Sequence, residues 1–401
     1  MLRSSLRFAS VLFPALTLFA VASLNAQQFP ETRSLTAQNR WSLLAKPAAD
    51  NSLKLDAAGN PVIAFWDNGR SLKLAHCANP TCSSGTITHT LDSDEVLAEV
   101  SLALNAAGNP VISYFSGNLD ARHGHLKVAA CADPNCSAGT VIATVDGGDD
   151  DSLTGLASSL VLDAAGNPIV SYTGIRGLKV VHCGDTTCTS NNVIKTIEAT
   201  AGEGYGTGSL ALDAAGNPVI SYVAAGTIYH VRVAHCGDPN CAAMTISTLK
   251  QVGAANTHGT SLALDADGNP VVAYFGAGLE VAHCADPNCS AHTVLTSVDH
   301  RASNGNRSSM VLDSDGNPVI SYAILVREGQ QVEDHLAVIR CGDPNCASGN
   351  VSASPDRSAI AGGFSSLRLD SRDRPVISYQ HIVDLLRPAV YLMHCGSRTC
   401  N

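Results

Sequence analysis

The sequence is poor in basic residues, in tryptophan and in long hydrophobic runs. Its 401 residues include 25 Lys and Arg against 35 Asp and Glu, and only two Trp. Nucleic acids and anionic membrane surfaces bind basic protein surfaces, so neither is a predicted partner. After residue 26 no stretch is apolar enough to span a bilayer, so no membrane insertion is predicted. The sequence also lacks any known catalytic or ligand-binding motif.

The first 26 residues have the composition of a secretory signal peptide. Arg3 and Arg7 precede an apolar run that begins at Val11, and small residues follow up to Ala26. The run is too short for a transmembrane helix. We therefore predict a signal peptide over residues 1–26 and a mature protein that is periplasmic or secreted. Its removal leaves 25 − 2 = 23 basic residues against 35 acidic ones, a net charge of about −12.

The remaining sequence is built from a repeated unit of about fifty residues. Seven copies begin at a serine, with 48 to 58 residues between successive starts. This length suits a four-stranded propeller blade and is too long for one coil of a β-helix. Seven copies predict an all-β, seven-bladed β-propeller. The starting residues are Ser52, Ser101, Ser159, Ser209, Ser261, Ser309 and Ser366.

Each unit contains four short strands, named A to D here, separated by turns. Strand A is Ser-Leu-x-Leu, whose alternation suits a short half-buried strand. The Asp-x-x-Gly-Asn-Pro segment after it predicts a tight turn with Gly at a positive φ. Strand B is Pro-Val-Ile-Ser-Tyr and strand C is Leu-Lys-Val-Ala-His-Cys, whereas strand D follows the second Cys of the unit.

The two ends of the chain are complementary. The seventh unit stops at Asn401, where its strand D should begin, and residues 28–44 have the length and composition of a strand D segment. We predict that this N-terminal strand closes the last blade and removes the exposed edge of the ring. Residues 27–401 then form a single propeller domain, with residues 27–44 as the closing strand, and we expect a monomer.

The 14 cysteines occur as seven pairs with four residues between the two members of each pair. An even number at fixed local spacing in an exported protein predicts disulfides between nearest neighbours. Each bond would join the ends of the turn between strands C and D and contribute about 2 kcal/mol. The pairs are Cys77 with Cys82, Cys131 with Cys136, Cys183 with Cys188, Cys236 with Cys241, Cys284 with Cys289, Cys341 with Cys346, and Cys395 with Cys400.

Metal binding is the alternative interpretation of these pairs, because a His precedes the first Cys in five units. A zinc site needs four converging ligands, whereas one blade offers three and the outer turns of neighbouring blades are held apart. Disulfides are therefore favoured, and neither a metal nor a cofactor is predicted. The five residues are His76, His182, His235, His283 and His394.

Calcium is the alternative interpretation at three other places. The segments that begin at Asp265 and Asp313 resemble the start of a calcium loop but lack the acid at position twelve. They are interpreted as turns. The third place is the acidic run of Asp146, Asp149, Asp150 and Asp151, which is interpreted as an exposed charged loop.

The repeat resembles NHL-type and related propeller repeats. The resemblance rests on Asp163-Ala-Ala-Gly166-Asn167 before a β-branched run and on its counterparts at Asp213, Asp265 and Asp313. It covers all seven units, although the Pro after Asn and the paired cysteines depart from that pattern. The resemblance implies a propeller fold and no particular activity, because such propellers bind many different ligands.

The connections between strands differ in regularity. The A-to-B and C-to-D turns lie on one face of a propeller and are nearly identical between units, whereas the B-to-C and D-to-A connections vary. We call the second the variable face and predict a specific site there. Candidate catalytic residues are His123, Tyr205, His258, His300 and Arg301. Candidate binding residues are Arg122, His125, Arg176, Tyr229, His230 and His381. Further polar residues on this face include Asp120, Glu203, Arg307, His335 and Arg387.

A tyrosine ends strand B in six units, and Phe65 takes its place in the first. Such a ring of aromatic side chains would suit a multivalent lectin if the rings stacked on sugars. Packing between blades is the favoured interpretation, because the feature repeats in every unit. The tyrosines are Tyr114, Tyr172, Tyr222, Tyr274, Tyr322 and Tyr379.

Two classes of function fit these observations. The regular repeat and the missing motif favour a secreted, non-catalytic binding or scaffold protein that engages a glycan or an extracellular protein. The alternative is an extracellular polysaccharide lyase or glycoside hydrolase, in which His and Tyr abstract a proton beside a uronate carboxylate while Arg offsets the charge. An enzyme requires one asymmetric site with perturbed titratable groups. The plainest interpretation of the candidate residues is a set of solvated loop side chains.

Overall fold

The computed structural model describes most of the chain after residue 31. The described residues are 32–34, 39–67, 71–93, 96–118, 123–147, 153–174, 177–199, 208–224, 226, 228–253, 259–291, 293–302, 307–328, 331–358, 360–384 and 387–401. The signal-peptide prediction for residues 1–26 lies outside them. No helix in the described part of the chain is long and apolar enough to cross a membrane.

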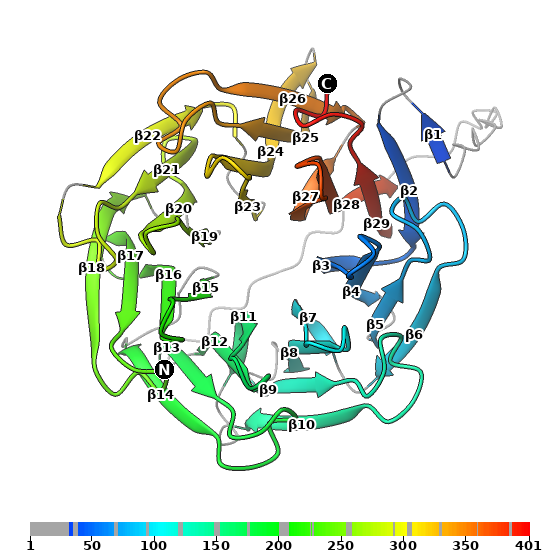
Figure 1. Ribbon diagram of the computed structural model, residues 1–401. Coiled ribbons are helices and arrows are strands. Elements are labelled where there is room, and N and C mark those ends of the chain that lie inside the picture. The colour runs from blue at the N-terminus through cyan, green and yellow to red at the C-terminus, as the bar shows by residue number, and fades with distance from the viewer. Residues whose placement is uncertain are drawn as a thin grey trace, which may run out of the picture. The chain divides into compact units, whose positions relative to one another are not determined.

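Residues 32–401 form seven antiparallel sheets arranged in a ring, as the sequence predicted (Figure 1). Six of them have four strands in the order A to D from the centre outward. Blade 1 contains β3 (Ala49–Leu55), β4 (Pro61–Asp67), β5 (Ser71–His76) and β6 (Ile87–Asp92). Blade 2 contains β7 (Val96–Leu104), β8 (Pro110–Asn118), β9 (His123–Ala130) and β10 (Val141–Asp146). Blade 3 contains β11 (Thr154–Leu162), β12 (Pro168–Gly174), β13 (Gly177–His182) and β14 (Val193–Ala199). Blade 4 contains β15 (Ser209–Leu212), β16 (Pro218–Ala224), β17 (Tyr229–Cys236) and β18 (Met244–Val252). Blade 5 contains β19 (Thr260–Leu264), β20 (Pro270–Phe275), β21 (Leu279–His283) and β22 (Val294–Asp299). Blade 6 contains β23 (Ser309–Leu312), β24 (Pro318–Glu328), β25 (Gln331–Arg340) and β26 (Val351–Asp356).

The seventh blade joins the two ends of the described chain. Its strands A to C are β27 (Ala361–Leu369), β28 (Pro375–Asp384) and β29 (Arg387–His394), and β2 (Arg40–Ala45) pairs antiparallel with β29 as strand D. The predicted closure by an N-terminal strand is confirmed, and β1 (Thr32–Ser34) adds a fifth strand outside β2. The side chain of Asn39 fastens this junction, because it donates to the carbonyl oxygen of Cys400 and accepts from the N–H of Gly396.

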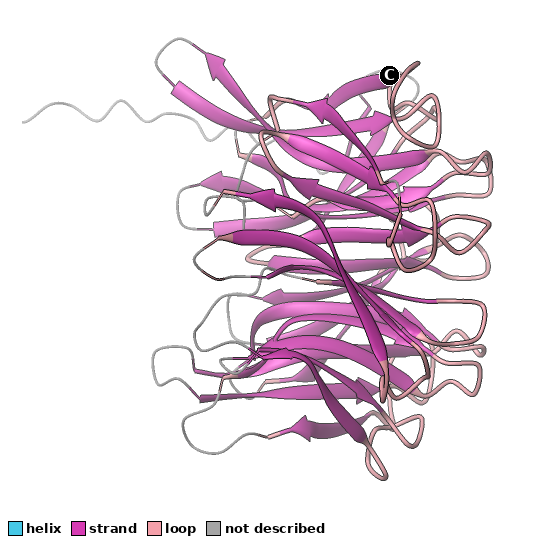
Figure 2. Cartoon of the chain, turned by 90° about the vertical axis from the view of Figure 1, so that its left-hand side faces the viewer, coloured by secondary structure: helices cyan, strands magenta, loops and turns pink. Residues whose placement is uncertain are grey.

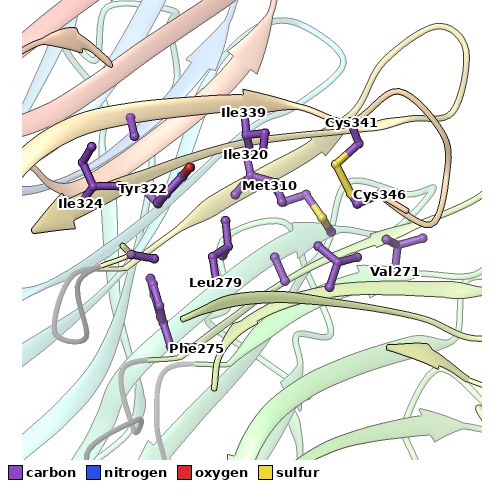
Figure 3. Close-up of a cluster of buried hydrophobic side chains, with 14 residues drawn as sticks. Val271, Phe275, Leu279, Met310, Ile320, Tyr322, Ile324, Ile339, Cys341 and Cys346 are labelled. Atoms are coloured by element: carbon purple, nitrogen blue, oxygen red, sulfur yellow. A yellow bond between two sulfur atoms is a disulfide. The ribbon is translucent and has the colours of Figure 1, made fainter. Parts of the chain in front are cut away.

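The core consists of seven apolar clusters, one between each pair of neighbouring blades. Figure 3 shows the cluster between blades 5 and 6, where Phe275 and Leu279 face Met310, Ile320 and Tyr322. Strand B is buried along its whole length in blade 4, because both faces of this middle strand pack against a neighbouring sheet. Each blade therefore depends on both of its neighbours for its buried surface.

The repeated tyrosines pack between blades. All six are 0% exposed, and five donate their hydroxyl hydrogen to a carboxylate at the end of strand D in the preceding blade. For example, the Tyr322 hydroxyl lies 2.8 Å from Oδ2 of Asp299. The packing interpretation is confirmed, because a ring without exposed surface is not available to stack on a sugar.

All seven predicted disulfides are present, with Cα atoms 4.8–5.0 Å apart. They lie in the C-to-D turns, which gather with the A-to-B turns and the C-terminus on one side of the ring (Figure 2). The second cysteine of every pair adopts a positive φ of 49–57°. The bond therefore holds a backbone conformation that a non-glycine residue rarely adopts.

The histidines before the cysteines link neighbouring blades. In blade 4, Nε2 of His235 lies 3.0 Å from the carboxylate of Asp213 in its own A-to-B turn, and Nδ1 lies 2.9 Å from Oδ1 of Asn288 in the next blade. Blades 1, 3 and 5 repeat both contacts. These imidazole nitrogens therefore join each of these blades to the next through structural hydrogen bonds.

The Asp-x-x-Gly-Asn segments are turns, as predicted. In blade 5, Oδ1 of Asp265 accepts the backbone N–H groups of Asp267 and Asn269 at 2.9 and 2.8 Å. Oδ1 of Asp313 accepts two equivalent N–H groups in blade 6. These carboxylate oxygens therefore serve as hydrogen-bond acceptors for the backbone of the turn.

Candidate functional site at the channel mouth

Strand A of each blade borders the centre of the ring (Figure 1). It follows the D-to-A connection and therefore begins on the variable face. The residue two positions before its serine lies at the entrance from that face. We call these positions the channel-mouth ring. Five of the seven have a positive φ, which turns the chain into strand A. In blade order the residues are Asp50, Glu99, Ala157, the residue at 207, which lies outside the described part, Gly259, Arg307 and Phe364.

The two carboxylates of this ring each hold the backbone of the next blade. Asp50 accepts the N–H of Glu99 and, at 3.3 Å, the N–H of Val100. Glu99 accepts the N–H of Ala157 through Oε2, and its carbonyl oxygen accepts the hydroxyl of Ser158 at 3.1 Å. Blades 1, 2 and 3 are therefore tied together at the mouth through charged groups.

Arg307 reaches both carboxylates from blade 6. Its Nη2 lies 2.8 Å from Oε1 of Glu99, and its Nη1 lies 3.8 Å from Oδ1 of Asp50. The guanidinium carbon is 5.6 Å from the centre of the Phe364 ring, within the range of a cation–π contact. The charged part of the ring is thus gathered on blades 1, 2 and 6, and the mouth is asymmetric although the fold repeats sevenfold.

The environment perturbs both acids in the same direction. Burial raises the pKa of Asp50, and the nearby Arg307 and the backbone N–H groups offset only part of that increase. Burial also raises the pKa of Glu99, where Arg307 lowers it and Asp50 raises it further. The side chain of Asp50 is 4% exposed, whereas those of Glu99 and Arg307 are each 23% exposed. Glu99 and Arg307 are therefore the members that a ligand can contact, and a carboxyl group with a raised pKa is suited to proton transfer.

The structure brings two predicted histidines together elsewhere on the variable face. His123 and His125 begin β9, and their Nε2 atoms are 2.9 Å apart. Burial lowers the pKa of His125, and the charges of His123 and Lys127 lower it further. The two rings lie edge to face, with their centroids 4.5 Å apart.

Two predicted catalytic residues follow strand D of blade 5. His300 is exposed and lies 3.5 Å from the carbonyl oxygen of Ala277. Arg301 donates from Nε and Nη2 to both oxygens of Asp299, at 3.0 and 2.8 Å, and Asp299 also accepts the hydroxyl of Tyr322. Arg301 is therefore part of the structural network of the repeated tyrosines.

The remaining predicted residues are spread around the variable face. Tyr229 and His230 begin β17 and are half-buried, and Tyr229 packs against the cluster between blades 4 and 5. The ring of His381 in β28 lies 5.3 Å from that of Tyr391. Four predicted residues lie outside the described part of the chain, namely Arg122, Arg176, Tyr205 and His258.

Asp50 and Glu99 were not among the predicted residues. Aligning the seven units on their first serine would have found them, because the position two residues earlier reads Asp, Glu, Ala, Thr, Gly, Arg and Phe. The serine itself does not vary. Variation at one fixed place in an otherwise regular repeat was the available signal.

No family model matches the sequence, and no curated protein matches it. Many solved structures share the fold, among them the following three. An ulvan lyase of polysaccharide lyase family PL25, bound to -[GlcA(1-4)Rha3S]-, is 11% identical with a TM-score of 0.54, over 88% of this chain and 95% of that one. The GH93 α-L-arabinofuranosidase of Fusarium graminearum, in complex with arabinobiose, is 12% identical with a TM-score of 0.51, over 73% and 93%.

The third is the Trypanosoma rangeli sialidase, which is 12% identical with a TM-score of 0.50. The match covers 77% of this chain and 56% of the sialidase, so the chain spans little more than half of that protein's length. At these identities the likeness shows the propeller fold alone.

Proposed function

We propose that this protein is a secreted glycan-binding propeller whose site is the channel-mouth ring on the variable face. The observation that carries the proposal is the asymmetric group of Glu99, Arg307 and Asp50 in a ring whose other described members are uncharged. The seven disulfides suit an oxidising compartment. The structural neighbours that act on or bind glycans support the choice of ligand class.

The chemistry of the ring suits a polyhydroxylated ligand. Each oxygen of Glu99 already accepts one hydrogen bond and retains a lone pair that can accept a sugar hydroxyl. Arg307 has further N–H groups to donate to ring oxygens or to an acidic substituent. Phe364, held beneath the guanidinium, offers an apolar ring next to these polar groups. Such a combination of few polar groups and one apolar surface is typical of a ligand site.

The test is a broad glycan array probed with the mature protein, the Arg307→Lys variant and the Arg301→Met variant. The Arg307→Lys variant keeps a positive charge beside the two acids but loses the forked donor geometry. We expect specific glycan binding that falls at least about tenfold in this variant and persists in Arg301→Met. Binding that depends on Arg301 rather than on Arg307, or no glycan binding by the wild type, would contradict the proposal.

Hydrolysis of the bound glycan is the second candidate function, and the raised pKa values of Asp50 and Glu99 favour it. A partly exposed carboxyl group that keeps its proton can protonate a glycosidic oxygen as a general acid. Glu99 would take this role, and Arg307 would stabilise the carboxylate left behind. Incubation with any glycan identified on the array, followed by assays for new reducing ends and for unsaturated uronate, distinguishes hydrolysis, elimination and binding without cleavage.

A further inference from the structure

A second site lies deeper in the centre of the ring. The seven A strands enclose a channel of about 420 Å³, into which the first serine of every unit points. Six of these serines accept the backbone N–H of strand A in the next blade at 2.9–3.1 Å. A serine oxygen that accepts such a bond keeps its own hydrogen free to donate. The channel wall therefore presents a ring of hydroxyl donors.

Two blades depart from the repeat at the next inward-facing position. Two residues after the serine, the other five blades carry Ala or Val, whereas blade 1 carries Lys54 and the adjacent blade 7 carries Arg368. Both cations line the channel, and none of the described residues that line it is acidic. The propeller fold does not require these charges, since five blades form the same strand with a small apolar residue there.

The two cations lack the carboxylate partners that other partly buried cations of this protein have. Lys127, Lys179 and Arg340 each contact a carboxylate. In the described residues, Lys54 and Arg368 form no ion pair, and Arg368 donates from Nη1 to its neighbouring carbonyl oxygen on Leu367. Two neighbouring like charges without a counter-ion raise the free energy of the folded protein until an anion joins them.

The electrostatics of the channel are consistent with this strain. The charge of Arg368, followed by burial, lowers the pKa of Lys54 well below its ordinary value. Burial lowers the pKa of Arg368 to about 10. Keeping each group charged in the channel therefore costs free energy, and a bound anion would offset that cost.

We propose that the channel binds a tetrahedral oxyanion between Lys54 and Arg368. The class comprises sulfate, phosphate and a sulfate ester at the end of a sugar. The two cations neutralise its charge, and hydroxyl groups of the serine ring donate to its oxygens. Strand A runs from the variable face toward the A-to-B turns, so this site lies on the far side of the serines from Arg307. It is independent of the glycan site proposed above.

The test measures the thermal unfolding midpoint of the mature protein at constant ionic strength, with chloride replaced stepwise by low concentrations of sulfate, phosphate or glucose 6-sulfate. A ligand that binds only the folded state raises the midpoint with the logarithm of its concentration. We expect this response in the wild type and in Lys195→Met, which removes an exposed lysine from β14. Lys54→Ala and Arg368→Ala each lower the affinity at least about tenfold.

The alanine variants are also informative without added anion. They place in blades 1 and 7 the residue that blades 2, 4 and 5 carry at this position, so the strand can accommodate them. Removal of the repulsion predicts a higher unfolding midpoint for Lys54→Ala than for the wild type in chloride. Stabilisation by glucose 6-sulfate but not by the inorganic ions would identify a sugar substituent as the ligand, and the reverse result a free ion.

An equal response to the anions in the wild type and in Lys54→Ala would overturn the proposal, because it would reflect a general salt effect. The absence of any response in the wild type would overturn it as well. Arg307→Lys keeps the anion response if the two sites are independent, so failure of the glycan proposal and failure of this one give different results.

Discussion

Two rings of residues at the starts of the same seven repeat units behave in opposite ways. The serine ring is identical in every blade and joins strand A to the next blade at six of the seven junctions. The channel-mouth ring, two residues earlier, contains acids, an arginine, a phenylalanine and small residues. Uniform positions in this repeat therefore carry the fold, and positions that vary on a regular frame are where a specific site can arise.

Loss of a uniform buried aromatic ring should have the largest effect on stability. Tyr322→Ala leaves a cavity between blades 5 and 6 and deprives Asp299 of a donor, so we expect a loss of about 3–5 kcal/mol in the free energy of unfolding. Denaturant unfolding provides the measurement. Tyr322→Phe is the control, and because blade 1 carries Phe65 at this position it should cost about 1 kcal/mol. Equal losses in the two variants would show that packing is not the role of the ring.

Removal of the arginine at the mouth should come next. Arg307→Met leaves the acids Asp50 and Glu99 without their cation, and we expect a loss of about 2–3 kcal/mol at neutral pH. The pKa of each acid is raised in the folded state, so their ionisation opposes folding as the pH rises above the ordinary values of 3.8 and 4.5. The loss should therefore vanish when the pH is lowered below about 4. A loss that is the same at both pH values would contradict this explanation.

The A-to-B turns should show the opposite pH dependence at a smaller cost. Burial raises the pKa of Asp213, but hydrogen bonds from His235 and Asn217 outweigh it and hold the pKa below 3.8. The contribution of this acid is present above its ordinary pKa and is lost as the pH falls through the lowered one. Asp213→Asn should cost about 1–2 kcal/mol at neutral pH and nothing in strong acid, as measured by unfolding at a series of pH values.

Blade 2 supplies a natural control for that variant. It carries Asn105 in place of the Asp and Ala130 in place of the His. Oδ1 of Asn105 still accepts two backbone N–H groups of the turn. Adding His235→Ala to Asp213→Asn copies this combination, so the double variant should cost little more than the single one. A fully additive double variant would mean that His235 and Asp213 do not act as a pair.

A single serine should have the smallest effect. Ser159→Ala removes the acceptor of the Leu210 N–H, and we expect a loss of about 1 kcal/mol. Ser209→Ala is the matched control, because no hydrogen bond to the Ser209 hydroxyl is found among the described residues. Its cost should be smaller when both are measured by thermal unfolding. If the two variants lose the same stability, the hydrogen bond to the next blade does not explain the contribution of the serine to stability.

The fold could be predicted from the sequence because the local motifs of the strands and turns recur from unit to unit. The serine of strand A and the cysteine spacing recur in all seven units and the Asp-x-x-Gly-Asn turn in five, so their common order along the chain predicted the strands and the disulfides. The role of His235 was less accessible, because its second partner, Asn288, belongs to the next blade and is 53 residues away. Local patterns do not encode such contacts between blades.

The site was harder to predict for a physical reason. The predicted candidates were histidines, tyrosines and arginines of the variable face. The structure spreads the described ones over blades 2, 4, 5 and 7, and Arg301 lies in a structural network. Glu99 and Arg307 meet only because the ring closes and brings residues 208 positions apart to within 2.8 Å. This contact between blades 2 and 6 forms only when the ring closes, and no single repeat unit contains both residues.

The separation of fold and function between the two rings is tested most directly by one glycan-binding titration. The wild type, Arg307→Lys and Ser159→Ala would be titrated with the strongest glycan from the array, and their unfolding midpoints would be measured in parallel. We predict at least about tenfold weaker binding for Arg307→Lys and unchanged binding for the less stable Ser159→Ala. Weakened binding in Ser159→Ala together with unchanged binding in Arg307→Lys would contradict the assignment of the site to the channel-mouth ring.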